Sequence, residues 1–206
     1  KQYPSSSLNQ TSTQRQSLPT ADCADPYFKN VNWFHALRAQ SPNLQLFPRD
    51  VACGIRPLGL HGATASPRPR AVVIGLLSHP TEDGEIVDEI KNALSHSAYS
   101  TGLLVHVDAH SGNLSSSVIK EIRSIMIQSL NSRSLLSNQT AASDFRVAIN
   151  PFRIRIERFK GSILLGHLTN FAVAKALGWE PRYYLMMASN SRFFRCGVEE
   201  YASRMQ

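Results

Sequence analysis

The sequence predicts a three-layer α/β fold built around a mostly parallel β-sheet. Four short segments rich in apolar residues, many of them β-branched or aromatic, recur at residues 71–77, 103–108, 145–149 and 183–188. Stretches with helical periodicity separate them. Strands that alternate with helices are typical of βαβ units, whose right-handed crossovers make the strands parallel.

Each expected element has its own local signals. The strand at 71–77 is apolar throughout, as in strands buried on both faces, and Pro151 ends the strand at 145–149. The first expected helix has suitable capping residues in Thr81, Glu82 and Asp83, and the second has them in residues 115–117. The third, at about 162–177, is expected to end at Gly178. The residues predicted to face inward are Ile86, Ile90, Ala93 and Leu94 in the first helix, Val118, Ile122, Ile125 and Met126 in the second, and Leu164, Leu168, Phe171 and Ala172 in the third.

The part of the chain before the first strand has a different composition. Residues 1–25 are rich in Ser, Thr, Gln and Asn, and such a segment buries too little apolar surface to order itself, so we expect a disordered stem or linker. Residues 26–70 predict an irregular lead-in with a short helix near 31–40. Residues 71–206 form the predicted domain, with its helices and sheet.

The charge balance favours anionic partners without identifying one. The net charge is +7, with 42% hydrophobic and 18% charged residues, and a solvated basic surface is the simpler explanation of the excess. The basic residues lack the interleaved aromatics of a single-strand binder, so we expect no nucleic-acid partner. No apolar run approaches the ~18 residues of a membrane span, so we expect membrane attachment only through a segment not present here.

Polar side chains follow three of the expected strands, and parallel strands bring such residues to one edge of the sheet. His79 follows the first strand, Asp108 and His110 the second, and the loop Ser189-Asn-Ser-Arg192, with its candidates Ser189, Asn190 and Arg192, the fourth. Asp108 is suited to accept hydrogen bonds from a ribose or a base, although an Asx turn is an equal alternative. His79 before Pro80 is also suited simply to shape a turn.

His106, Asp108 and His110 share one face of an extended chain, a spacing compatible with metal binding. Asp108-Ala-His110 echoes the D-A-H-x-D motif of arginase-like metallohydrolases, but Gly112 replaces the second Asp and no later D-x-D follows. We therefore expect neither a metal nor a cofactor, and we expect His106 to be a core histidine.

Three segments, in order and spacing, resemble one enzyme family over about residues 71–200. Val105-His-Val-Asp108-Ala-His-Ser111 looks like an I-H-V-D-x-K-S segment, and Arg158-Phe-Lys-Gly-Ser162 like R-x-x-W-G-x-x-S. Tyr184-Leu-Met-Met-Ala-Ser-Asn-Ser191 looks like F-I-N-L-S-x-x-D-Y-P-L. The family is the Core-2/I-branching β-1,6-N-acetylglucosaminyltransferases and related GT-A glycosyltransferases.

The resemblance implies a Rossmann-like, GT-A-like nucleotide-binding half. It implies metal-independent transfer of a sugar, of GlcNAc or xylose type, from a UDP-sugar to a glycan or glycoprotein acceptor. Arg158 and Lys160 become candidate phosphate-binding residues. It also implies that the catalytic base lies beyond Gln206, so the chain as it stands is expected to be a fragment, and whether it is active alone stays open. Ser191, where the family has Asp, favours an alternative: a non-catalytic glycan- or protein-binding domain.

The resemblance further implies the Golgi or secretory lumen, as the lumenal part of a type II membrane protein. Glycosylation sequons at Asn9, Asn113 and Asn138 are compatible with that location. Cys23, Cys53 and Cys196 form no C-x-x-C motif. A Cys23–Cys53 disulfide and three free thiols both remain open.

Overall fold

The computed structural model describes residues 45–46, 70–82, 84–134, 145–157 and 160–205. The expected tail at 1–25, almost all of the lead-in at 26–70, Cys23, Cys53, Asn9, Asn138 and Arg158 lie outside these residues. What is described is an α/β fold in which helices flank both faces of a parallel sheet, as the sequence predicts.

The sheet contains four strands: β2 (Val72–Ser78), β3 (Gly102–Val107), β4 (Val147–Ile149) and β6 (Tyr183–Ala188). They are ordered β4-β3-β2-β6, and every neighbouring pair is parallel. Each agrees with a predicted segment to within a residue, except that β4 starts two residues later. Leu76 pairs with both Val105 and Met187, which sets the register across the centre of the sheet.

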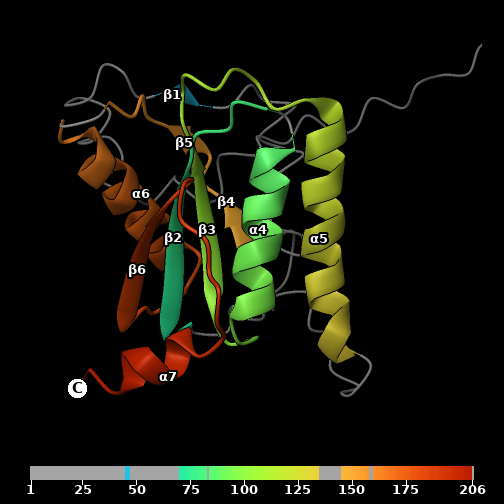
Figure 1. Cartoon of the computed structure of the whole chain (residues 1–206), viewed down its shortest axis with the longest axis vertical. Helices are drawn as coiled ribbons and strands as arrows, with labels where there is room; N and C mark the ends of the chain where they lie inside the picture. Colours follow the sequence, from blue (N-terminus) through green and yellow to red (C-terminus); the bar gives the residue numbers. More distant parts are fainter. Residues whose placement is uncertain (1–44, 47–69, 83, 135–144, 158–159, 206) are drawn as a thin grey trace, which may run out of the picture.

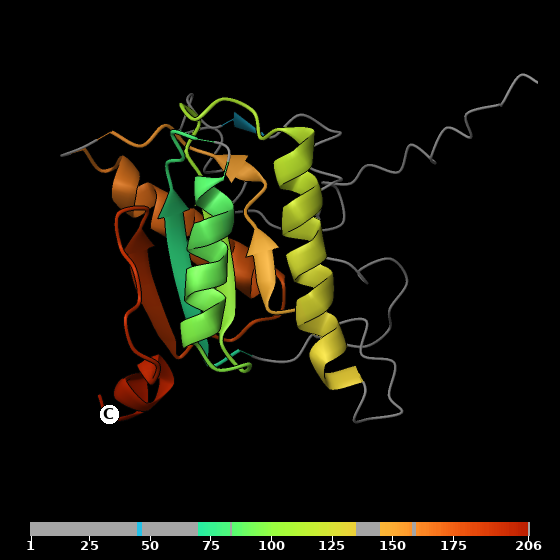
Figure 2. The same cartoon turned by 45° about the vertical axis from the view of Figure 1, so that its right-hand side comes forward.

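Two helices cover one face of the sheet and one covers the other (Figures 1 and 2). Helices α4 (Glu85–His96) and α5 (Ser116–Ser134) lie together, while α6 (Ser162–Ala176) lies across the sheet from them. The short helix α7 (Val198–Ser203) closes the amino edge, where Glu199 accepts hydrogen bonds from the Ala98 amide and the Thr101 hydroxyl. A small antiparallel pair of β1 (Gln45–Leu46) and β5 (Phe152–Arg153), not predicted from the sequence, follows β4.

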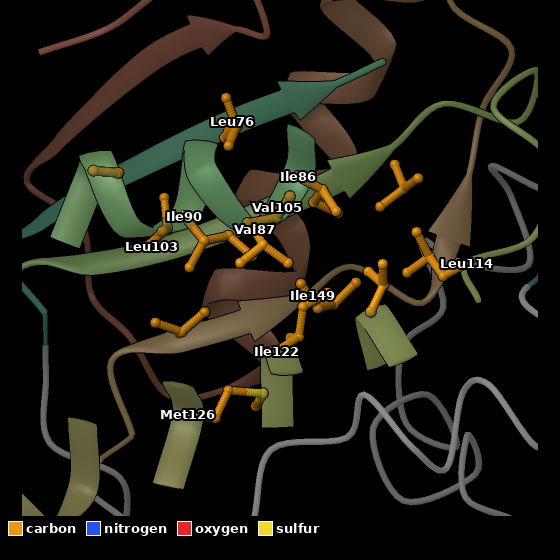
Figure 3. Packing of buried hydrophobic residues seen from close by; sticks show 14 of the residues in the cluster. Leu76, Ile86, Val87, Ile90, Leu103, Val105, Leu114, Ile122, Met126 and Ile149 are labelled. Carbon is orange, nitrogen blue, oxygen red and sulfur yellow. The ribbon is translucent and has the colours of Figure 1, made fainter. Parts of the chain in front are cut away.

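The core between the sheet, α4 and α5 is aliphatic (Figure 3). Ile86, Ile90 and Ala93 of α4 are buried there, as are Val118, Ile122 and Met126 of α5, which confirms the predicted inward faces of these two helices. The predicted α4 cap is wrong in detail, because the N-cap residue is Gly84 and makes no side-chain hydrogen bond. Instead the Glu85 carboxylate accepts a 2.5 Å hydrogen bond from the Thr81 amide.

The second core, beneath α6, contains aromatic residues and requires glycines. Trp179 is buried against Phe145, with ring centroids 5.9 Å apart, and it covers Gly102 so closely that a Cβ there would lie 2.8 Å from the indole. Tyr184 likewise lies over Gly75, where a Cβ would come within 1.7 Å of the phenol oxygen. Both strands therefore need glycine where an aromatic ring crosses them.

The predicted inward face of the third helix is wrong. Leu164, Leu168 and Phe171 of α6 are exposed, and the buried face carries Gly166, His167, Thr169, Asn170, Val173 and Ala174. Asn170 faces the sheet because its side-chain amide donates to the carbonyls of Leu76 and Leu104, both at 3.3 Å, and its oxygen accepts from Asn150 at 2.9 Å. Buried polar groups need such partners, so hydrogen bonding rather than apolar periodicity orients this helix.

Candidate functional site

The strand order reverses direction between β2 and β6. The chain runs outward from β2 through β3 to β4 with α4 and α5 on one face, then returns past β3 and β2 to β6 with α6 on the other face. In open parallel sheets the crevice outside the carboxyl ends of the strands, at such a switch point, is where ligands bind. The residues after β2, β3 and β6 are therefore the candidate site.

The strand register aligns these residues at the edge. Ser78 pairs with Val107, so one step further His79 is level with Asp108. Leu77 pairs with Ala188, so Ser78 is level with Ser189. Because side chains alternate along a strand, Ser78 and His79 point to opposite faces of the sheet. The edge therefore has two polar clusters, one on each side of β2.

The first cluster surrounds Asp108. Its Oδ2 lies 2.5 Å from Nδ1 of His79, and its Oδ1 accepts from the backbone amides of His110 at 3.1 Å and Ile156 at 3.0 Å. The bond from the His110 amide is the Asx turn that the sequence offered as an alternative. Asp108 is fully buried, so it is not the accessible edge residue that the sequence suggests. A ligand at this edge would meet the neighbours of Asp108 first.

The environment of Asp108 keeps it ionised. Burial alone would raise the pKa of Asp108, but the hydrogen bonds from the Ile156 and His110 amides and from His79 lower it below its ordinary value. Arg153 reinforces the position, because its guanidinium donates to the carbonyls of Asp108 and Gly112, at 2.6 and 2.5 Å. The result is a fixed, buried negative charge beneath the edge.

The two histidines beside Asp108 are accessible. The side chain of His79 is 52% exposed and that of His110 is 38% exposed, and their rings meet edge to face with centroids 6.5 Å apart. His110 Nδ1 lies 3.6 Å from Asp108 Oδ1. When the Nδ1–H of neutral His79 donates the hydrogen bond to the Asp108 carboxylate, Nε2 carries the lone pair. Asp108 thus sets which ring nitrogen His79 presents to a ligand.

His106 belongs to the core, as expected. It is fully buried, and its Nε2 accepts a 2.9 Å hydrogen bond from the Ile154 amide. Burial lowers the pKa of His106 to about 4, so the ring is neutral at physiological pH. Its role is to connect β3 to the segment that follows β5.

The second cluster contains Ser78, Glu89 and Arg192, on the α4 face of the sheet. The Ser78 hydroxyl donates to Glu89 Oε2 at 2.5 Å, and Arg192 Nη1 lies 3.8 Å from Glu89 Oε1. Burial raises the pKa of Glu89 to about 6, although the Ser78 hydrogen bond and the charge of Arg192 both favour the carboxylate. Sequence reasoning missed Glu89. Its spacing from Ile86 and Ile90 puts it on the apolar face of the helix, and that was the available signal.

The loop after β6 is tied to α4 rather than to Asp108. Arg192 donates to the carbonyls of Ser189 at 2.6 Å and Ser191 at 3.0 Å, which folds the loop on itself. The Asn92 side chain bonds both the amide and the carbonyl of Phe193, at 2.9 and 3.1 Å. Asn190 is exposed at the tip and Ser189 is half-buried. Ser189, Asn190 and Arg192 therefore lie on the predicted edge, but across β2 from Asp108.

The cations near the edge have acidic neighbours. Lys160 pairs with Glu157, which also pairs with Arg155 at 3.3 Å. Lys160 is mostly exposed, so it is able to exchange that partner for a ligand anion. The other phosphate-binding candidate, Arg158, lies outside the described residues. Positive charge at this edge is thus present but already compensated.

Several further sequence features have a definite place. Asn113 is exposed in the loop between β3 and α5, and Ser115 of the same sequon accepts from the Val118 amide and so caps α5. Cys196 is exposed and forms no disulfide with any described cysteine. Within the described ranges, no three His, Cys, Asp or Glu side chains are grouped to hold a metal ion. None of the described helices is long and apolar enough to cross a membrane.

Comparisons with known proteins do not place the chain in a family. No model of a known protein family matches it, and no curated protein matches it significantly.

Proposed function

We propose that the chain binds a nucleotide sugar in the crevice between the loops that follow β2 and β6, as the donor-binding half of a metal-independent GT-A-like glycosyltransferase. The observation that carries the proposal is the His79–Asp108 pair, which lies beside the switch point of the strand order. The order β4-β3-β2-β6 matches the first four strands of the Rossmann-like doubly wound arrangement, in which nucleotides bind at that place. The three motifs that resemble the Core-2/I-branching family add the sugar donor.

In this proposal Asp108 acts through the histidines. Because it is fully buried and already holds His79 and two backbone amides, it positions the ring of His79 instead of touching the donor. His79 and His110 then contact the base or ribose, and Ser189 and Asn190 offer hydrogen bonds from the other side of the crevice. Each of these four side chains is at least partly exposed.

The diphosphate would engage Arg192, with Arg158 and Lys160 as further candidates. Arg192 lies 3.8 Å from Glu89 and its side chain is 37% exposed, so a more highly charged anion is able to take it from that carboxylate. Such a cation would stabilise the leaving UDP during transfer. We assign no residue of this chain as the base that deprotonates the acceptor.

The remaining parts of the proposal rest on the resemblance. The donor is a UDP-sugar of GlcNAc or xylose type, the acceptor is a glycan or glycoprotein, and the site of action is the Golgi or secretory lumen. The exposed Asn113 is compatible with glycosylation there.

A second candidate is a non-catalytic glycan- or protein-binding domain of the same fold. The observation in its favour is electrostatic, because Lys160 pairs with Glu157 and Arg192 with Glu89, and Ser191 supplies no carboxylate. A domain that no longer binds a sugar donor would keep the fold, while the basic side chains that once bound the phosphates pair with acidic residues.

Calorimetric titration with UDP tests the proposal. We expect binding that weakens about tenfold or more in Arg192→Ala, since a hydrogen bond to a charged group contributes about 1.5–3 kcal/mol. Arg182→Ala is the matched control, because Arg182 is an exposed arginine at the opposite end of the same strand. His79→Ala, with His96→Ala as its control, tests the other side of the crevice. No heat at millimolar UDP refutes donor binding, and glycan binding without UDP binding supports the second candidate.

A further inference from the structure

The outward face of α6 is apolar. Leu164, Leu168 and Phe171 are 57%, 53% and 39% exposed, and their spacing of four and three residues puts them in one stripe along the helix. The outer face of a surface helix normally carries polar residues. In α6 the polar Thr169 and Asn170 are instead buried against the sheet. The buried face also contains the apolar Val173 and Ala174, so α6 is apolar on both faces, and its outer stripe points away from the core.

The stripe lies beside β6, which is an edge strand. One side of β6 pairs with β2, and no described strand pairs with the other. Phe171 packs edge to face on Tyr184 of β6, with ring centroids 5.7 Å apart, so the Phe171 end of the stripe contacts β6. Figure 1 shows the helix α6 beside β6. Met186, on the same face of the strand as Tyr184, is 65% exposed. We call Leu164, Leu168, Phe171 and Met186, with the open edge of β6, the α6–β6 face.

Charge is nearly absent from this face. Lys175 is the one charged residue in α6 and β6 together, whereas the shorter α4 carries Glu85, Asp88, Glu89 and Lys91. Natural edge strands usually carry charged side chains that prevent pairing with another chain, and β6 has none. Because the whole chain carries a net charge of +7, two copies repel each other over most of their surface. The α6–β6 face itself adds no like-charge repulsion between two copies, because none of its side chains is charged.

We propose that the α6–β6 face binds the same face of a second copy of the chain. A two-fold axis perpendicular to the sheet would pair the two β6 strands antiparallel and make one continuous sheet across both copies. The same axis places both α6 helices on one face of that sheet, with their apolar stripes toward each other. A two-fold interface must be self-complementary, and an uncharged strand edge flanked by an apolar stripe meets this requirement because it contains no like charges to oppose.

Sedimentation velocity over a range of concentrations tests the dimer. We expect a species of twice the chain mass. Leu168→Glu and Met186→Glu should each lower the association constant on the order of a hundredfold, because each dimer would bury the new carboxylate twice. Ile127→Glu is the matched control, because Ile127 is an exposed apolar residue, 40% exposed, on α5 and so across the sheet from α6. It should leave the association constant unchanged.

A second measurement identifies the surface directly. Amide hydrogen exchange in Tyr183–Ala188 should slow as the dimer forms, because the open edge of β6 becomes paired. All the substituted side chains are exposed, so circular dichroism and thermal unfolding at low concentration should match the parent protein and show that each variant folds. A chain that stays monomeric up to about 100 μM overturns the proposal and leaves the face to a different partner. A dimer that Leu168→Glu and Met186→Glu do not weaken, or that leaves the β6 amides unprotected, overturns it as well.

Discussion

Glu89→Gln should remove a part of the pH dependence of stability whose sign and size follow from the burial of this carboxyl. Burial raises the pKa of Glu89 from an ordinary 4.5 to about 6. Between these values the folded protein binds more protons at this residue than the unfolded chain does, so the contribution of Glu89 is present below pH 4.5 and is lost as pH rises through about 6. Since one pH unit corresponds to about 1.4 kcal/mol, the loss is about 2 kcal/mol.

Glutamine isolates this effect because its side-chain oxygen still accepts the hydrogen bond from Ser78 while it carries no titratable proton. Urea unfolding of the parent and of Glu89→Gln, repeated from about pH 4 to pH 8, gives the difference in the free energy of unfolding at each pH. All other titrations cancel in that difference. We expect the parent to lose about 2 kcal/mol relative to the variant as the pH rises.

Glu85→Gln is the control of opposite sign. Hydrogen bonds from the Thr81 and Glu82 amides lower the pKa of the partly exposed Glu85, so its contribution is lost as the pH falls. A parent-to-Glu89→Gln difference that is flat from about pH 4 to pH 8, or that rises with pH, would refute the assignment of Glu89 as a buried, desolvated acid.

Three further substitutions test the packing around the site, each by urea unfolding. Asp108→Ala should lower the free energy of unfolding by about 1–3 kcal/mol, since it removes a fully buried carboxylate and leaves the partly buried Ile156 amide without its acceptor; a loss under about 0.5 kcal/mol would mean an accessible edge residue. Gly75→Ala should cost about 1–3 kcal/mol, because the new methyl group overlaps the ring of Tyr184, and a double-mutant cycle with Tyr184→Val should show that the two effects are not additive. Asn150→Ala should cost about 1–3 kcal/mol for each buried group left unpaired, and an unchanged stability would contradict the hydrogen bond to Asn170.

The first half of the fold could be predicted from local patterns. The run from Val72 to Leu77 has no polar side chain because both faces of β2 are covered. The spacing of Ile86, Ile90 and Ala93 likewise predicts the single buried face of α4. Periodicity works in these elements because their buried faces are almost wholly apolar. The same reasoning fails for α6, where Asn170 must face the sheet to bond Asn150 and two strand carbonyls, so that Leu164 and Leu168 point outward.

The residues of the candidate site also fall into those that the sequence predicted and those that it did not. Asp108 and the two histidines were predicted because they follow strands, and parallel pairing brings such residues together. Glu89 was not predicted, since a glutamate in an amphipathic helix is ordinarily solvated and only the depth of α4 against Ser78 shows that this one is buried. The burial of Asp108 was also hidden, because the Ile156 amide that binds it comes from a segment 48 residues further along the chain.

The sequence by itself determined which segments become the four strands of the parallel sheet and the helices α4, α5 and α6, and which polar residues reach its carboxyl edge. Hydrophobic periodicity and strand ends carry that information locally. Only the tertiary structure decided the strand order β4-β3-β2-β6, the orientation of α6, and the separation of the edge into an Asp108 cluster and a Glu89 cluster on opposite sides of β2. These depend on contacts between residues distant in sequence, where the need of each buried polar group for a partner outweighs the local pattern.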